Sequence, residues 1–283
     1  MLALAIDLGG THATCALVRD GQILSKQTVS SSGSDELGPM LPRFTSVFRD
    51  IVARSGLRVE DCAGVALGFC GLADFDAGRV LSTDEKYADA PGLDLTAWAR
   101  EDLGLPFRIE NDARLALLGE RTAGAARGSD DVVMMTLGTG IGGAAMIGGK
   151  LLRGKHYQAG CLGGHLTLNP TGRRCTCGAT GCAESEASTW ALPLLAAAWP
   201  GFEDSCLARE DTLNFARLFE AADAGDAIGK EIVRHCVNVW AALTVSLIHA
   251  YDPEIVVIGG GVMRRAGQLL PAIRKRAETA WTP

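Results

Sequence analysis

Apolar and polar positions along the first thirty residues follow the pattern of short β-strands. The apolar run LALAI at 2–6 ends at Asp7. Segment 9–18 begins with two glycines and continues with short apolar stretches, as does segment 21–29. An apolar run, a Gly-Gly turn and a returning run predict an antiparallel pair of strands, and the alternation in 21–29 predicts a third strand.

The next segments alternate between helical and strand-like spacing. Helices are predicted over 36–56, 93–104 and 111–124, and strands over 63–71 and 106–110. Pro42 must lie in the first turn of the first helix, where its missing N–H costs nothing. Asn111 or Asp112 caps the third helix.

The pattern then restarts. Residues 131–152 again predict a strand, a glycine-rich turn and a returning strand, followed by a long helix over 226–251, a buried strand over 253–261 and a last helix over 266–280. This repetition predicts an α/β fold of two similar lobes with a cleft between them, an N-terminal lobe at 1–117 and a C-terminal lobe at 118–283.

Composition narrows the protein class. The chain has 283 residues, 47% apolar and 21% charged, with a net charge of −6. An acidic chain is a poor candidate for binding nucleic acid, because affinity for the phosphate backbone depends on clustered Lys and Arg. The start lacks the basic region of a signal peptide, and no run of about 18 apolar residues predicts a membrane span. Cytoplasmic location is therefore expected.

Nine cysteines in such a chain favour metal binding or catalysis over disulfides. Five of them stand singly among mostly apolar neighbours and are interpreted as small buried hydrophobic residues. These are Cys15, Cys62, Cys70, Cys206 and Cys236.

The stretch GGHLTLNPTGRRCTCGATGCAE at 163–184 supplies three thiolates and one imidazole. His165, Cys175, Cys177 and Cys182 suit a tetrahedral structural Zn²⁺, whereas iron–sulfur clusters usually take four cysteines. Cys161 is a spare thiol outside this set. The alternative is that the four are unliganded core residues.

Two glycine-rich turns are candidate phosphate loops. In DLGGT at 7–11 the two glycines let backbone N–H groups approach an anion. Asp7 can hold a hydrated Mg²⁺, and Thr11 offers a hydroxyl to phosphate. The alternative is a tight hairpin turn. LGTGIGG at 137–143 resembles a dinucleotide fingerprint, but a strand follows where that motif needs a helix. The remaining interpretations are a row of N–H groups for phosphate, or a plain turn.

Asp112 follows a predicted strand and opens a helix, where the helix dipole favours a carboxylate. Such a group can take a proton from a sugar hydroxyl that attacks phosphorus, and Asn111 beside it can hold the sugar. Simple helix capping is the alternative. The strand and glycines at 255–262 are a weaker signal of a nucleotide site.

In this order, DLGGTH, ENDA, LGTGIGG and above all CTCGATGCAE resemble the ROK family of sugar kinases and regulators, over essentially the whole chain. The resemblance implies two actin-like, ribonuclease H-like lobes, a homodimer, and ATP with Mg²⁺ and structural zinc as cofactors. Residues implied to bind ATP are Asp7, Gly9, Gly10, Thr11, Gly138, Thr139, Gly140, Gly142, Gly259, Gly260 and Gly261. Asp112 is implied as the general base, Asn111, His165 and Glu184 as sugar contacts, and His165, Cys175, Cys177 and Cys182 as zinc ligands.

The chain departs from the family pattern in three places. Leu162 stands where a sugar-binding Glu is usual, which implies a sugar other than glucose or an N-acetylated hexosamine, or a differently placed one. His12 replaces a frequent Lys after the first loop. Members usually extend some tens of residues further than Pro283, so a truncated C-terminal end is expected.

Three functions compete on this evidence. An ATP-dependent sugar kinase acting on the 6-hydroxyl of a hexose or hexose derivative accounts for all the motifs. A catalytically weak sugar-binding or sensing protein is the alternative that Leu162 favours; a DNA-binding repressor would need a helix-turn-helix domain before the strand at residue 2. A zinc-ribbon module would leave the two phosphate loops without a purpose.

Overall fold

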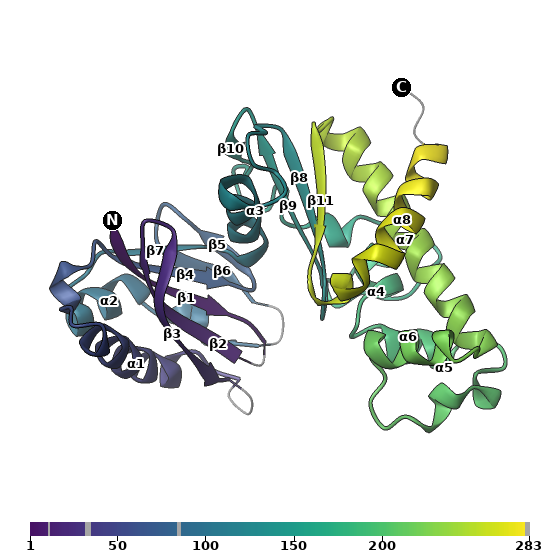
Figure 1. The fold of residues 1–283 in the computed structure, drawn as a ribbon, viewed down its shortest axis with the longest axis horizontal. Coiled ribbons are helices and arrows are strands. Elements are labelled where there is room, and N and C mark those ends of the chain that lie inside the picture. The colour runs from purple at the N-terminus through teal and green to yellow at the C-terminus, as the bar shows by residue number, and fades with distance from the viewer. Residues whose placement is uncertain (11, 32–34, 84–85, 281–283) are drawn as a thin grey trace. The chain divides into compact units, whose positions relative to one another are not determined.

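The computed structural model describes residues 1–283 except 11, 32–34, 84–85 and 281–283 (Figure 1). The chain divides into two compact units. Unit 1 contains Met1–Ala116 with Lys155–Tyr157, and unit 2 contains Leu117–Gly154 with Gln158–Pro283.

Unit 1 is built on a five-stranded sheet of order β3-β2-β1-β4-β7. Its strands are β1 (Leu2–Leu8), β2 (His12–Arg19), β3 (Gln22–Ser30), β4 (Val65–Phe69) and β7 (Phe107–Asn111). β1, β2 and β3 pair antiparallel, whereas β4 pairs parallel with both β1 and β7. In the register, Leu8 lies beside Phe69 and Phe69 beside Asn111. The carboxyl ends of β1, β4 and β7 therefore lie at the same edge of the sheet. Ligands of open α/β sheets bind at such carboxyl edges.

Two helices cover one face of this sheet. α1 (Leu41–Arg54) contacts β2 and β3, and α2 (Leu95–Leu103) contacts β7 and α1 (Figure 1). α1 buries Phe44, Phe48 and Ile51, which recur at helical spacing, and Pro42 lies in its first turn as predicted. Asp94 caps α2 by accepting the Ala97 N–H at 2.8 Å, and α2 ends at a glycine with φ +69°. A small hairpin, β5 (Leu72–Asp74) with β6 (Arg79–Ser82), completes the strands.

Unit 2 repeats the same arrangement of strands. β8 (Val132–Leu137), β9 (Ile141–Ile147) and β10 (Lys150–Leu151) pair antiparallel, and β11 (Ile255–Gly259) pairs parallel with β8. The order is β10-β9-β8-β11. In each unit the first strand turns through glycines into an antiparallel neighbour and takes a later parallel strand on its other side. The predicted repetition along the chain is therefore confirmed.

The helices of unit 2 are α4 (Ala183–Ala187), α5 (Leu192–Ala197), α6 (Phe215–Asp223), α7 (Ala227–Tyr251) and α8 (Ala266–Ala280); α3 (Asp112–Ala123) passes from unit 1 into unit 2. α7 contacts α4, α6, α8 and β8. Among the described residues, α7 alone is long and apolar enough to cross a membrane by length and composition. It buries Ile232, Cys236, Trp240 and Leu247 in the core of unit 2, as the central helix of a globular unit does.

Several features were not predicted. Helices were expected after the cysteine segment, and α5 and α6 lie there, but the β5–β6 hairpin and the short helix α4 have too few residues for a periodic signal. The interpretation of Cys206 as a buried residue was wrong: its thiol lies exposed at the start of a 3₁₀ turn, and Cys70 is only half-buried. Cys15, Cys62 and Cys236 are buried as expected.

Candidate functional site

Asn111 is the last residue of β7 and caps α3. Its Oδ1 accepts the N–H of Arg114 at 3.2 Å, and its Nδ2 donates to the carbonyl of Gly71 at 3.2 Å and to Asp112 Oδ1 at 3.0 Å. The side chain is buried. Of the two capping candidates, Asn111 is therefore the cap, which leaves Asp112 with its carboxylate beside this amide.

Asp112 carries a raised pKa. Desolvation by nearby protein atoms is the main cause, although Asp112 is exposed, and the negative charge of Asp7 adds to it. The N–H of Ala113, at 2.8 Å from Asp112 Oδ1, and the Asn111 amide act in the opposite direction. The expected stabilisation of the charged form by the helix N-terminus is thus outweighed, and the group is a stronger base than an ordinary aspartate.

A buried ion pair supports this turn and was missed in the sequence. Arg114 has no exposed side-chain surface, and its Nη1 lies 3.3 Å from Glu110 Oε1. The same Glu110 oxygen accepts the Asn111 N–H at 2.9 Å, and Arg114 Nη2 donates to the Tyr157 carbonyl at 3.0 Å. An arginine within an otherwise apolar helical face was the available signal.

The first predicted phosphate loop follows β1 at the same sheet edge. Asp7 is exposed there, and the Gly9 N–H donates to the His12 carbonyl at 2.9 Å. Tyr87, fully buried, donates its hydroxyl to the Gly9 carbonyl at 2.8 Å. The negative charge of Asp7 also acts on Asp112. Thr11, also predicted to bind phosphate, lies outside the described residues.

In unit 2, the second predicted phosphate loop joins β8 to β9. Glu184, buried on α4, accepts the Ile141 N–H on Oε2 at 2.7 Å and the Trp190 indole N–H on Oε1 at 3.1 Å. A Cβ at Gly140 would lie 2.4 Å from Glu184 Oε2, so a larger residue there would displace this carboxylate. Thr189 donates its N–H and its hydroxyl to the Gly138 carbonyl, and the Trp190 N–H donates to the Thr139 carbonyl.

The glycines after β11 lie beside this loop. Gly259 pairs with Thr136 in the parallel register, and Gly260 has φ +94°. A Cβ on Gly260 would lie 2.3 Å from the carbonyl oxygen of Leu137. The structure therefore brings together two of the predicted nucleotide segments, 138–142 and 259–261, at one edge of the unit 2 sheet.

The predicted metal ligands converge on one point. The ligand atoms of His165, Cys175, Cys177 and Cys182 all lie within 4.8 Å of one another. Cys175 Sγ is 3.5 Å from His165 Nδ1, and Cys177 Sγ is 3.6 Å from Cys182 Sγ. Tetrahedral zinc, with sulfur at about 2.3 Å and nitrogen at about 2.0 Å, separates its donors by roughly 3.5–3.8 Å. The donor set and its spacing therefore fit a zinc ion.

Local turns hold these ligands in place. Gly178 and Gly181 have φ +89° and +70°, and a Cβ on Gly181 would lie 1.4 Å from the carbonyl oxygen of Asn169. Burial raises the pKa of Cys182 to about 12, and a bound metal cation would favour its thiolate form. Cys182 also precedes α4, which carries Glu184, and so joins the metal cluster to the second loop within unit 2.

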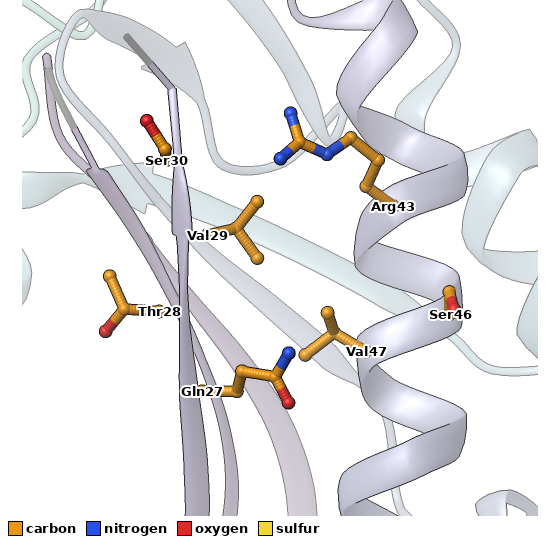
Figure 2. A pocket seen from close by; sticks show the side chains of 7 residues that line it. All are labelled: Gln27, Thr28, Val29, Ser30, Arg43, Ser46 and Val47. Atoms are coloured by element: carbon orange, nitrogen blue, oxygen red, sulfur yellow. The ribbon is translucent and has the colours of Figure 1, made fainter.

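A separate hollow in unit 1 holds none of the predicted site residues. It has a volume of about 330 Å³ and lies between β3 and α1 (Figure 2). Its lining residues are Gln27, Thr28, Val29, Ser30, Arg43, Ser46 and Val47.

The sequence matches the family model of the ROK family over residues 3–281. This chain belongs to the ROK family. It is 33% identical over 273 residues to a glucokinase from Thermotoga maritima, a match that covers 94% of this chain and 84% of that protein.

Two solved structures of ROK proteins resemble the chain in sequence and fold. A ROK hexokinase from Thermus thermophilus superposes with a TM-score of 0.79 at 31% identity, covering 100% of this chain and 90% of that one. A ROK family glucokinase from Streptomyces griseus, solved with glucose and AMPPNP, gives 0.78 at 31% identity, covering 99% and 89%. The predicted actin-like α/β fold is confirmed.

Proposed function

We infer that this protein is an ATP-dependent sugar kinase that transfers the γ-phosphoryl group of ATP to the 6-hydroxyl of a hexose or hexose derivative. The observation that carries this proposal is Asp112, a carboxylate with a raised pKa at the carboxyl edge of a parallel sheet, beside a glycine loop. The family and the glucokinase relatives support it.

In the proposed reaction Asp112 accepts the proton of the attacking hydroxyl. The hydroxyl oxygen forms a bond to the γ-phosphorus while the bond from that phosphorus to the bridging oxygen breaks. ADP leaves with the bonding electron pair, and Asp112 later releases its proton to solvent. Asn111 Nδ2 donates a hydrogen bond to the Asp112 carboxylate, so the base is already oriented before the reaction.

The glycine loops would present backbone N–H groups to the phosphates, where they stabilise negative charge without reorganisation. Mg²⁺, held by Asp7, would supply further positive charge to the phosphates when ATP is bound. The zinc ligands would keep His165 and α4 in place, a structural role.

The sugar contacts are proposed to be Asn111, His165 and Glu184. Glu184 already accepts two protein N–H groups, but each carboxylate oxygen has a second lone pair that a sugar hydroxyl can use. Leu162 lies just before the 3₁₀ turn that carries His165 and is 37% exposed. Its side chain has no acceptor for a hydrogen bond from a sugar hydroxyl. We therefore propose a sugar other than glucose or an N-acetylated hexosamine, or a shifted sugar position.

Leu162 also favours the second candidate, a ROK protein that binds or senses a sugar with weak catalysis. A panel of hexoses, ketohexoses and N-acetylhexosamines, assayed by sugar-dependent ADP release from the zinc-loaded protein, separates the two. Turnover with any sugar supports the kinase. Sugar binding without turnover supports the sensor. A homodimer, cytoplasmic location and the absence of nucleic-acid binding stay predictions.

Asp112→Asn tests the mechanism. The amide cannot take the proton, so kcat should fall by about 10²–10⁴-fold. The sugar Kd, measured by calorimetry, should change far less than kcat, because the asparagine amide can still form a hydrogen bond with the hydroxyl. Retained turnover would remove Asp112 from the reaction.

Asp50→Asn is the matched control. Asp50 pairs with Arg54 at 3.1 Å on the exposed surface of α1, and its loss should leave both kcat and the sugar Kd unchanged.

A further inference from the structure

Lys86 is a half-buried cation at the first phosphate loop. Its Nζ donates to the carbonyl of Gly10 and, at 3.0 Å, to the carbonyl of Ser31. It also lies 5.3 Å from the centroid of the Tyr87 ring. Its partners in the described chain are thus neutral oxygens and an aromatic ring, and none of the ion pairs there includes it.

The loop itself has no cation of this kind. Residues 7–12 contain neither Lys nor Arg, and Asp7 adds a negative charge. A polyphosphate at this edge would meet two carboxylates, Asp7 and Asp112, which repel it. Among the residues that the structure describes, Lys86 forms no ion pair and donates to two carbonyl oxygens, so its third N–H can serve an anionic ligand.

The charges of Lys86 and of the proposed base, Asp112, both act on the thiol of Cys70. Burial and then the negative charge of Asp112 raise the pKa of this thiol to about 11, with a smaller contribution from Asp7, while the charge of Lys86 lowers it. All three charged groups therefore act on one atom at the carboxyl edge of the sheet. The attacking hydroxyl must lie beside Asp112, and the phosphorus it attacks lies next to that hydroxyl.

The residues that follow Lys86 are held in place. Tyr87 has φ +61°, a conformation uncommon for a residue with a side chain, and its hydroxyl is bonded to Gly9. Asp89 accepts the N–H groups of Leu37 and Gly38, each at 2.7 Å. An ammonium on such a segment is oriented before the ligand arrives, which lowers the entropic cost of binding.

We propose that Lys86 contacts the transferred phosphoryl group of ATP and supplies the positive charge that the first phosphate loop lacks. This rests on the proposed kinase function, which identifies the anion as ATP. The alternative is a structural role, in which Lys86 only ties Gly10 to Ser31.

Binding of AMPPNP and of ADP, measured by calorimetry on the full zinc-loaded chain with Mg²⁺, separates these roles. Lys86→Met should weaken AMPPNP about 10- to 100-fold, the worth of a charge-assisted hydrogen bond, and ADP by less than about threefold. Lys86→Arg should keep most of the AMPPNP affinity. In the sugar assay Lys86→Met should lower kcat by about 10²–10³-fold and leave the sugar KM unchanged.

Lys26→Met is the matched control, since Lys26 is an exposed lysine of β3 in the same unit, and it should alter neither affinity. Equal losses for AMPPNP and ADP, or no loss for either, would overturn the proposal for Lys86. A wild-type protein that binds neither nucleotide would overturn the kinase proposal itself, so the two failures are distinguishable.

Discussion

At the scale of single residues, the chemistry of Asp112 depends on its neighbours. The Ala113 N–H and the Asn111 amide favour the carboxylate, but desolvation and the charge of Asp7 outweigh them and raise the pKa. A higher pKa makes a better proton acceptor, provided the group remains ionised at the working pH. The residue is thus a better proton acceptor than an ordinary aspartate.

The pH dependence of kcat/KM follows from this shift. The base works only when ionised, so activity should be lost as pH falls through the raised pKa of Asp112. The acid limb should therefore lie at a higher pH than the value of about 3.9 for an ordinary aspartate. Asp7→Asn removes a negative charge and should move that limb to lower pH, even where the rate falls. A limb at or below the ordinary value would contradict the assignment.

At the scale of elements, close backbone contact decides how the metal-binding segment meets the sheet of unit 2. The 3₁₀ turn Gly163–His165 packs on β9. A Cβ on Gly164 would lie 1.8 Å from the carbonyl oxygen of Ile141, and one on Gly143 would lie 3.0 Å from the Gly160 carbonyl oxygen. The ligand His165 therefore owes its position to glycines that allow two backbones to touch.

Gly164→Ala should destabilise the protein by about 1–3 kcal/mol, because the added methyl group meets a backbone atom that cannot move aside cheaply. Thermal and urea unfolding of the zinc-loaded protein measure this change.

Gly119→Ala is the control, since that glycine lies within α3 and a methyl group added there would have no neighbouring atom within 4 Å. It should be neutral or stabilise by about 0.5–1 kcal/mol, because alanine loses less entropy in a helix. Equal stability of Gly164→Ala and the wild type would contradict the packing argument.

At the scale of the whole molecule, the two units share one strand arrangement but carry different functional residues. Unit 1 carries Asp112 and the first loop, and unit 2 carries the second loop and the metal cluster. In unit 2 the cluster is joined to the loop through α4, from Cys182 to Glu184 and on to the Ile141 N–H. Loss of the metal should therefore affect the stability of unit 2 as a whole.

Cys177→Ser should lose the bound zinc, because serine is a poor zinc ligand. Zinc at a free concentration of 100 times its Kd adds about 2.7 kcal/mol to the free energy of unfolding. Thermal unfolding of Cys177→Ser should therefore begin several degrees below that of the wild type. Elemental analysis of zinc per chain and calorimetric unfolding measure both effects.

Cys206→Ser provides the control, since Cys206 is another exposed thiol but lies outside the cluster. It should keep both the zinc and the unfolding temperature. Full zinc content in Cys177→Ser would remove Cys177 from the ligand set.

The main elements could be predicted from the sequence because their signals are local. Strands β1, β2 and β8, the glycine turns and helix α7 each follow from spacing within a few residues. The metal ligands were also predictable, since Cys175, Cys177 and Cys182 lie close in the chain and their turn needs only two glycines. Short elements such as β5 and α4 have no such periodicity.

What the sequence by itself determined, then, is the order of the strands and helices, their repetition and the chemistry of the cysteine segment. Only the tertiary structure decided which distant groups meet: Lys86 with Gly10, Glu184 with Ile141, and Arg114 with the Tyr157 carbonyl. It also decided that desolvation outweighs the helix terminus at Asp112 and that Cys206 is exposed. Hydrophobic periodicity depends on neighbours a turn or two apart, whereas hydrogen bonds between remote segments and the desolvation of a charge depend on every element packed around them.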